Sequence, residues 1–416
     1  MLIYGKEIMM TPAIVVIGYN RPDSLKRILA SIENAFYPEG VNPTLVISLD
    51  KCDVSDTAVA AREFVYTHGE KRVVERPERM GLKNHVLACG EFAAEYDGII
   101  VLEDDLFVSP SFYVYAQNAL EFTKDDERIG GVSLYNHLFN VHVRESFCAI
   151  DDGFDNWYFQ LASSWGQAYT KNQWDSFMKW YREYTADEAD SKSDGANSSS
   201  SSNGKMKSNP YVPANVSGWS DKSWLKFYIT YLIETDKYFL YPRVSYTTNF
   251  GDVGSHMDKP DTDLQVPISC KRGNISFYFS TLDESNSVYD SFFENCRIED
   301  TICDLYGIKP ISKMLKNESR YILSSQVLSY KVVKSYGRQM RPHDANVIYD
   351  VPGCNFYLYE ISDSAENSDE TTVKKSSETM VKNAEKWFYQ YRGISASQMI
   401  QMLKYRVREK FVSGKK

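Results

Sequence analysis

The sequence predicts an α/β fold built on a mostly parallel sheet flanked by helices, with a C-terminal extension. Short runs of β-branched apolar residues alternate with stretches in which apolar residues recur every three or four positions. Four such alternations lie within about a hundred residues, which is typical of strand and helix units whose strands pair in parallel. Polar residues follow each apolar run, at the strand ends where such sheets bind ligands.

The first unit begins with the apolar run AIVVI at residues 13–17, which predicts a strand. A turn follows, and then Leu25, Ile28 and Ile32 recur at helical spacing. The later units repeat this order, with a strand at 45–49, a helix capped by Asp56, a short strand at 73–74, a helix after Gly81 and a strand at 98–102. These units indicate a Rossmann-like sheet.

Composition divides the rest of the chain. Residues 186–209 hold almost no apolar side chains and include a run of serines, which predicts a mobile insertion. We expect an aromatic-rich helix at 219–231 and a strand near 238–246. The predicted organisation is a main domain over 1–260, a C-terminal extension over 261–361, a polar linker over 362–382 and a basic amphipathic tail helix over 383–416.

The chain has 416 residues, of which 47 are basic and 56 acidic, and its net charge of −9 argues against nucleic acid as a partner. No segment approaches the roughly 18 uncharged apolar residues that a membrane-spanning helix needs, and the first residues lack a secretory signal. We therefore expect a cytoplasmic protein. The seven cysteines are scattered without a CxxC pair, which argues against a disulfide framework or a zinc site.

Three adjacent carboxylates, Glu103, Asp104 and Asp105, follow the strand at 98–102 directly. Adjacent carboxylates repel one another unless a positive charge is near. Hard oxygen ligands suit Mg²⁺ or Mn²⁺, ions that keep open positions for water and substrate phosphates. We therefore expect a divalent metal at this edge of the sheet. The alternative is that these acids cap the helix that begins a few residues later.

Other polar residues stand at the ends of neighbouring elements. Arg21 follows the first strand, where it can pair with phosphate, and Asp50 follows the second, where it can accept a hydrogen bond from a base or a ribose hydroxyl. Lys83 and Asn84 open a helix whose N-terminal amides favour anions. A surface salt bridge for Arg21 and a capped turn for Asp50 are the structural alternatives.

Five segments resemble, in order, the motifs of GT-A fold glycosyltransferases: VIGYNR, VISLD, GIIVLEDDLFVSPSFYVYAQNAL, SSWGQAYTKNQWDSF and YPRVSYTTNFGDVGSH. They are most similar to the N-acetylglucosaminyltransferase I family and to bacterial sugar transferases related to it. The resemblance covers residues 11–257, and the EDDL segment with its downstream SPxFYxY is the most specific part. It implies a GT-A fold that transfers a sugar from a nucleotide donor, with a UDP-sugar as the expected donor.

The resemblance also implies residue roles. Asp105 matches the metal ligand of the family, while Glu103 and Asp104 match residues that contact the ribose and the donor sugar. Arg21 and Asp50 fall on nucleotide-binding positions.

The sequence differs from the family at one of the nucleotide-binding positions. Asn84 occupies a position where the animal enzymes carry a histidine near the uracil, which weakens the implied preference for uridine.

Three further motifs imply the rest of the site. Asp221 is the only acid in WSDKSW, which matches the segment where the family places its catalytic carboxylate. Ser255 and His256, in NFGDVGSH, match residues that close over the donor, and Trp165 and Gly166 of SSWGQAY lie on the acceptor side. The alternatives are that Asp221 caps the next helix, that His256 has no role in the site and that Trp165 belongs to the core.

The roles that the resemblance implies combine into one reaction. A metal at Asp105, Mn²⁺ or Mg²⁺, neutralises charge on the leaving nucleoside diphosphate, while Asp221 removes the proton of an attacking acceptor hydroxyl. A single displacement inverts the anomeric centre. We expect the acceptor to be a glycan or lipid-linked glycan in surface polysaccharide assembly.

Two alternatives remain for the activity. A sugar-phosphate nucleotidyltransferase is disfavoured because GYNRPD is not a glycine-rich basic loop. A non-catalytic sugar-binding relative of the transferases is the other.

The C-terminal tail has a distinct charge. Ile400, Leu403, Val407 and Phe411 recur at helical spacing, and residues 404–416 carry six bases and one acid, a net +5 against −14 for the rest of the chain. This pattern predicts an amphipathic helix that lies on an anionic membrane surface. A helix docked on its own protein is the alternative.

Overall fold

The computed structural model describes residues 9–53, 55–141, 145–193, 209, 212–252, 265–297, 321–324, 331–360 and 394–413. The chain divides into two compact units, Met1–Ile361 and Ser362–Lys416. The first holds the sheet, and the described part of the second holds helix α11 (Ala396–Ser413). Most of the predicted insertion at 186–209 and the whole of the predicted linker lie outside the described residues.

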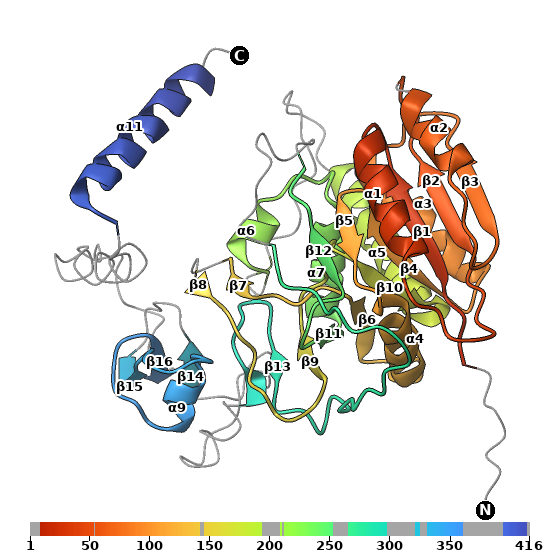
Figure 1. The fold of residues 1–416 in the computed structure, drawn as a ribbon. Helices are drawn as coiled ribbons and strands as arrows, with labels where there is room; N and C mark the ends of the chain where they lie inside the picture. Colours follow the sequence, from red (N-terminus) through yellow and green to blue (C-terminus); the bar gives the residue numbers. More distant parts are fainter. Residues whose placement is uncertain are drawn as a thin grey trace, which may run out of the picture. The chain divides into compact units, whose positions relative to one another are not determined.

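A nine-stranded sheet forms the centre of the first unit, in the order β13-β9-β11-β6-β10-β4-β1-β2-β3 (Figure 1). Five of its eight strand pairs are parallel, and the antiparallel pairs are β10 with β4, β10 with β6 and β11 with β9. The predicted mostly parallel α/β sheet is therefore confirmed. The strands are β1 (Ala13–Gly18), β2 (Leu45–Leu49), β3 (Lys71–Glu75), β4 (Gly98–Glu103), β6 (Ile129–Ser133), β9 (Asn156–Phe159), β10 (Gln167–Thr170), β11 (Tyr238–Pro242) and β13 (Val288–Tyr289).

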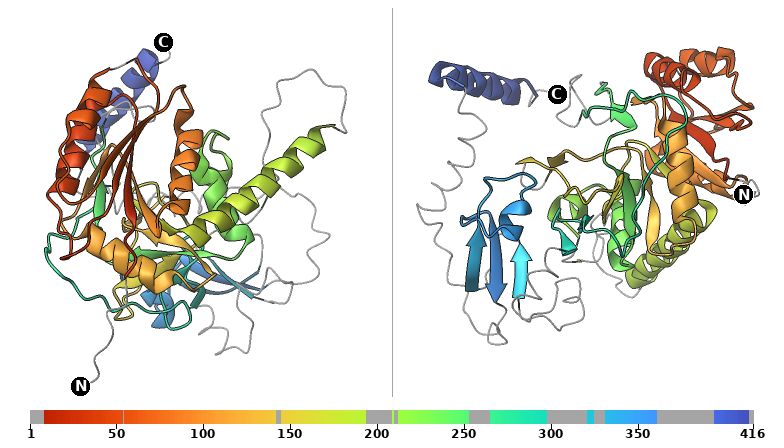
Figure 2. Two further views of the ribbon diagram at one scale, coloured as in Figure 1. Left: turned by 90° about the vertical axis from the view of Figure 1, so that its right-hand side faces the viewer. Right: turned by 60° about the horizontal axis from the view of Figure 1, so that its bottom comes forward.

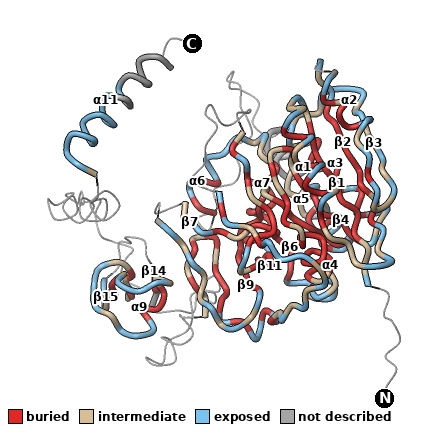
Figure 3. The backbone as a smooth tube through the Cα atoms, in the orientation of Figure 1, coloured by how far each residue is buried: buried red, intermediate tan, exposed pale blue. Residues whose placement is uncertain are grey.

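Helices cover both faces of the sheet, which is why β1 is buried along its whole length (Figures 2 and 3). Ile14 and Val16 belong to the apolar cluster with α1, α2 and α4, whereas Val15 and Ile17 belong to the cluster with α3, α5 and α7. A strand buried on both faces needs the continuous apolar run that the sequence has here. The helices are α1 (Pro22–Glu33), α2 (Ser55–Glu63), α3 (Gly81–Gly90), α4 (Phe112–Thr123), α5 (Lys171–Ser193) and α7 (Trp224–Glu234).

Two predicted helix boundaries differ from the structure. Asp56, expected as a cap, lies in the first turn of α2, where its negative charge still favours the helix N-terminus. The aromatic helix begins at Trp224, five residues later than expected, because the side chain of Ser223 caps it by accepting a hydrogen bond from the Lys226 amide. The short helix α6 (Ala214–Ser217) precedes it.

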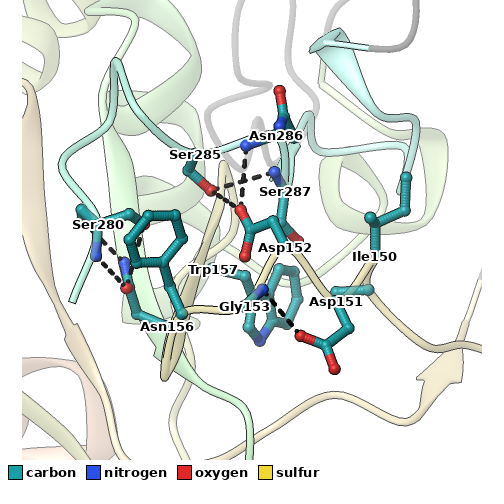
Figure 4. A network of polar contacts seen from close by, with 12 residues as sticks. Ile150, Asp151, Asp152, Gly153, Asn156, Trp157, Ser280, Ser285, Asn286 and Ser287 are labelled. Atoms are coloured by element: carbon teal, nitrogen blue, oxygen red, sulfur yellow. Dashed lines mark hydrogen bonds between the residues drawn. The ribbon is translucent and has the colours of Figure 1, made fainter. Parts of the chain in front are cut away.

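A buried carboxylate ties the segment that precedes β13 to the loop that precedes β9 (Figure 4). Asp152 accepts hydrogen bonds from Ser285 Oγ at 2.8 Å and from the Asn286 amide at 3.0 Å, and its other oxygen accepts from Arg243 at 2.6 Å. The Asp152 side chain is only 3% exposed. Its charge is thus compensated by a guanidinium and two neutral donors, as a buried carboxylate requires.

A small three-stranded sheet, in the order β14-β16-β15, has a hydrophobic cluster of its own. It connects to the main sheet through Tyr289 of β13, whose hydroxyl donates to Asp344 at 2.6 Å and accepts from the Ile150 amide at 2.9 Å. Burial raises the pKa of Asp344 to about 7. The elements of this part are β14 (Tyr321–Ser324), β15 (Lys331–Tyr336), α9 (Ala345–Ile348) and β16 (Phe356–Glu360).

Candidate functional site

The sheet brings the predicted polar residues to one edge. Ile17 lies opposite Glu103 and Gly18 lies opposite Leu49, so the residues that follow β1, β2 and β4 leave the sheet side by side. Strand β10 runs in the opposite direction, with Gln167 opposite Val101. The residues just before β10, Trp165 and Gly166, therefore lie at the same edge as the carboxylates that end β4.

Arg21 binds two of the three carboxylates. Its guanidinium donates to Asp104 through Nη2, and Nη1 lies 3.4 Å from Asp105 Oδ2. Burial alone would lower the pKa of Arg21, but Asp104 and Asp105, with a smaller contribution from Glu103, raise it above its ordinary value. The salt bridge expected as a structural alternative for Arg21 is present, and it lies inside the carboxylate cluster.

Burial is the largest influence on the pKa values of Asp104 and Glu103. It raises the pKa of Asp104 to about 6, against the opposing charge of Arg21. Burial, followed by the charges of Asp105 and Asp104, raises the pKa of Glu103 to about 8. One guanidinium therefore does not compensate three carboxylates, and the cluster favours a further cation.

Asp105 has an oxygen suited to that cation. Its Oδ1 is buried and has no hydrogen-bond partner among the described residues, although Oδ2 faces Arg21. A buried carboxylate oxygen without a partner is costly unless an ion or a ligand satisfies it. No group of three metal-ligating side chains occurs in the described part of the chain. The donor set thus fits an ion held by one carboxylate together with substrate phosphates and water, as Mg²⁺ often is.

Strand β12 (Thr247–Asn249) pairs in an antiparallel direction with β5 (Leu106–Val108), the strand that begins immediately after Asp105. The Phe250 amide, just after β12, donates to the Asp105 carbonyl at 2.9 Å. Asp252 then accepts hydrogen bonds from Ser24 Oγ at 2.6 Å and from the Arg27 guanidinium, which lies 3.9 Å above the Phe250 ring. We call Arg27 and Asp252 the α1 clamp, because they fasten the chain after β12 to α1.

The α1 clamp also lowers the pKa of Asp252. Burial by itself raises the pKa of Asp252, but the hydrogen bonds from Arg27 and Ser24 outweigh it and hold that pKa below its usual value. Asp252 lies inside the motif NFGDVGSH, which is the signal that could have found it. Arg27 occupies an ordinary helical position and gave no signal in the sequence.

Asp50 binds the start of α3. Its Oδ1 accepts from the amides of Lys51 at 2.9 Å and Met80 at 2.8 Å, and its Oδ2 accepts from the Gly81 amide at 2.9 Å. The carboxylate therefore joins the end of β2 to the first turn of α3, instead of capping a turn with Asp53. Its role at a nucleotide stays a prediction.

Lys83 and Asn84 have contacts within the protein. The Lys83 ammonium lies 5.0 Å from the centre of the Phe227 ring of α7, and Asn84 is exposed and donates to the Met80 carbonyl at 3.2 Å. Lys83 thereby links α3 to α7. No anion contact is described for either residue, so their donor-binding roles stay predictions.

Asp221 forms an ion pair. Its Oδ1 accepts from Lys226 Nζ at 2.8 Å, and the same ammonium donates to the Trp219 carbonyl at 2.9 Å. The Lys226 side chain is only 4% exposed, whereas that of Asp221 is 38% exposed. Because Ser223 caps α7, the alternative that Asp221 is the helix cap is wrong. Sequence reasoning missed Lys226, because a lysine in an aromatic helix carries no signal of a buried partner.

Trp165 is half-buried in an aromatic cluster. Its ring centre lies 4.8 Å from that of Tyr135 and 5.9 Å from that of His137. His137 is buried, and neither of its ring nitrogens has a hydrogen-bond partner within the described residues. Gly166 adopts φ of +94°, and a Cβ there would come within 2.7 Å of Thr247 Cγ2. The loop that carries Trp165 is thus held tightly beside β12.

Ser255 and His256 lie outside the described residues. Their predicted position over the donor stays a prediction.

The sequence matches no protein-family model and no curated protein. Part of it is similar to solved glycosyltransferase structures. One is the mannosyltransferase PcManGT from Pyrobaculum calidifontis, in complex with GDP-Man and Mn²⁺, which is 17% identical over 39% of this chain and 45% of that chain, with a TM-score of 0.29.

Another similar structure is TarS from S. aureus, 10% identical over 57% of this chain and 36% of that chain, with a TM-score of 0.33. A third is TarS 1-349 in complex with UDP-GlcNAc, 10% identical over 27% of this chain and 32% of that chain, with a TM-score of 0.23. The chain spans between 32% and 45% of the length of these structures. At these scores the likeness gives no evidence on the reaction.

Proposed function

We propose that the protein is a metal-dependent, inverting glycosyltransferase that moves a sugar from a nucleotide donor, with a UDP-sugar as the first candidate. One observation carries the proposal: the buried, unpartnered Oδ1 of Asp105 stands among three carboxylates that a single arginine does not neutralise. A divalent ion and the diphosphate of a nucleotide sugar together satisfy that oxygen and the guanidinium of Arg21. The motif resemblance to the N-acetylglucosaminyltransferase I family supports the same assignment.

In this proposal Asp105 holds Mn²⁺ or Mg²⁺, and the ion supplies charge neutralisation for the leaving diphosphate when it is bound. Arg21 orients a phosphate, while Glu103 and Asp104 contact the ribose and the donor sugar. Asp50 positions the nucleotide end of α3, because its hydrogen bonds from the Met80 and Gly81 amides fix the start of that helix.

The remaining donor contacts are assigned by the resemblance and by position. Lys83 and Asn84 contact the nucleotide from the first turns of α3, which begins at Gly81. Ser255 and His256 close over the donor.

Asp221 is proposed as the base that accepts the proton of the attacking hydroxyl. Its side chain is partly exposed and is held by the nearly buried ammonium of Lys226, so the carboxylate is fixed in orientation yet accessible. Trp165 and Gly166 form the acceptor side, where a half-buried indole can offer one face to a sugar ring. We propose a glycan or lipid-linked glycan of surface polysaccharide assembly as the acceptor.

The test is nucleoside diphosphate release from a panel of UDP-glucose, UDP-galactose, UDP-GlcNAc and GDP-mannose, with Mn²⁺, with Mg²⁺ and with EDTA. We expect release from at least one donor, and its loss in EDTA. Asp105→Asn should lower the rate at least about 100-fold, because it removes the ligand charge. Asp175→Asn, an exposed acid in a surface ion pair with Lys171, serves as the matched control.

The role of Asp221 is tested separately. Asp221→Asn should lower transfer by about 100-fold or more while donor binding stays unchanged, because only the proton acceptor is lost.

Full metal-dependent turnover by Asp105→Asn would refute the metal assignment. Donor binding without turnover in any condition would favour the non-catalytic alternative.

A further inference from the structure

Within the second unit, helix α11 has large apolar side chains that its own unit leaves uncovered. Leu403 is 65% exposed and Ile400 is 54% exposed, and Met399, Met402 and Val407 are exposed as well. At 3.6 residues per turn, Ile400, Leu403 and Val407 fall on one face of the helix. A contiguous exposed apolar face of this kind marks an interaction surface.

Basic residues border this apolar face on both sides. Lys404 and Arg408 lie at positions along one border, and Arg406 and Lys410 at positions along the other. The polar face opposite carries Gln398 and Gln401. An apolar stripe flanked by bases of one sign is the arrangement of helices that lie in the plane of an anionic lipid surface, where the bases reach the phosphates.

The same charges argue against a second copy of the chain as the partner. If Ile400 and Leu403 formed the seam of a parallel coiled coil, Lys404 and Arg406 would take the flanking positions, so that both helices would carry bases beside the seam. Like charges at flanking positions oppose pairing.

The helix is suited to lie on a bilayer instead of crossing it. Within the described part of the chain, no helix is long and apolar enough to cross a membrane. Its 18 residues include five charged ones, Lys404, Arg406, Arg408, Glu409 and Lys410. Charges at such density are incompatible with the bilayer interior but are accommodated at the headgroups.

We propose that α11 is an interfacial anchor that binds anionic lipid bilayers, with Ile400, Leu403 and Val407 facing the acyl chains and the flanking bases facing the lipid phosphates. The net charge of +5 over residues 404–416, against −14 for the rest of the chain, restricts the attraction to this end of the protein. The proposal is independent of the reaction proposed above, because binding to vesicles requires no donor.

The test is sedimentation of the full chain with vesicles of phosphatidylcholine containing 30 mol% phosphatidylglycerol, at low and high salt. We expect binding that falls at 0.5 M NaCl and is at least tenfold weaker for pure phosphatidylcholine. Lys404→Gln with Arg408→Gln should weaken binding roughly 10- to 30-fold, since each basic residue near the surface contributes about a fivefold factor. Ile400→Gln with Leu403→Gln should abolish it within the range of the assay.

Gln401→Ala, a change on the polar face, is the matched control and should bind as the unchanged chain does. Size-exclusion chromatography with light scattering on the same variants tests the competing partner. The proposal is overturned if the Ile400 and Leu403 variant sediments like the unchanged chain, if binding is equal on charged and neutral vesicles, or if no vesicle binding occurs. In the last case a change of oligomeric state among the variants indicates a second copy as the partner, and an unchanged state indicates a helix docked on its own protein.

Discussion

Gly166 meets two constraints, a left-handed backbone conformation and close contact with β12. We predict that Gly166→Ala lowers the free energy of unfolding by about 2–4 kcal/mol, from backbone strain together with the clash on Thr247. Gly153→Ala is the control, because Gly153 has φ of +88° but nothing within 4 Å of an added Cβ, and it should cost only about 1–2 kcal/mol. Urea denaturation of both variants measures the difference, and equal losses would exclude the packing constraint.

His137 is a buried imidazole among aromatic rings, and burial lowers its pKa to about 3. The folded state therefore resists protonation, and the unfolded state gains the proton first as the pH falls. Above pH 6.5 the imidazole is neutral in both states and has no effect on the pH dependence of stability. Between pH 6.5 and 3, protonation of His137 in the unfolded state lowers the free energy of unfolding by up to about 1.4 kcal/mol per pH unit.

His137→Phe should make the free energy of unfolding fall less steeply with pH over that window. Some dependence should remain, because burial also lowers the pKa of His85 to about 4. At pH 7 the variant should be as stable as the unchanged chain or more so, since it removes two unpartnered buried nitrogens. Urea titrations at pH 7, 5.5 and 4.5 measure the slope, and an unchanged slope would contradict the prediction.

Single residues differ in how well the sequence predicts them. The placement of Asp50 and Asp105 at one edge follows from their position after apolar runs, because the ends of parallel strands must meet. Lys226 could not be predicted, because its partner depends on how α7 packs. The unpartnered oxygen of Asp105 also becomes visible only in three dimensions.

At the scale of elements, the α1 clamp decides how firmly β12 supports the carboxylates. We predict that Asp252→Asn speeds hydrogen exchange of the Phe250 amide by roughly 3- to 10-fold, since the weakened ion pair with Arg27 is partly buried. That amide donates to the carbonyl of Asp105, so it reports on the site directly.

Asp283→Asn is the control for this clamp. Asp283 also pairs with an arginine, Arg128, but belongs to the segment before β13. It should leave exchange at Phe250 unchanged. Equal acceleration in both variants would mean that the α1 clamp has no specific effect on this edge.

The sequence predicted the first strands well because apolar runs and turns alternate there without interruption. It predicted a strand near 238–246 but did not predict β10, because a strand of only four residues has too short an apolar pattern to be recognised. It also gave no indication of the pairing of β12 with β5, which joins residues about 140 positions apart, such as Thr247 with Val108.

At the scale of the whole first unit, Tyr289 connects the small sheet to the large one. Tyr289→Phe removes the hydroxyl that donates to the Asp344 carboxyl and accepts from the Ile150 amide, which costs about 1–3 kcal/mol. We predict that amides of β16 exchange about 5- to 100-fold faster, while those of β1 keep their protection. Hydrogen exchange read by mass spectrometry measures both.

Tyr278→Phe is the control for this prediction. Tyr278 lies in the same described segment as Tyr289, residues 265–297, but is 68% exposed. It should change neither set of amides. If Tyr289→Phe accelerates β1 as much as β16, the two sheets unfold together and the connection has no local role.

The strand directions divide the functional edge into two halves with separate origins. Strands β6 and β11 end at the edge where β4 ends, and β9 and β10 begin there. Under the proposed function, the turns after β1, β2 and β4 form the nucleotide half, whereas the chain between β6 and β9 and the residues before β10 supply the other half. The proposed function therefore predicts that a chimaera that takes only these later connections from a related transferase acquires a new acceptor preference and keeps its affinity for the nucleotide.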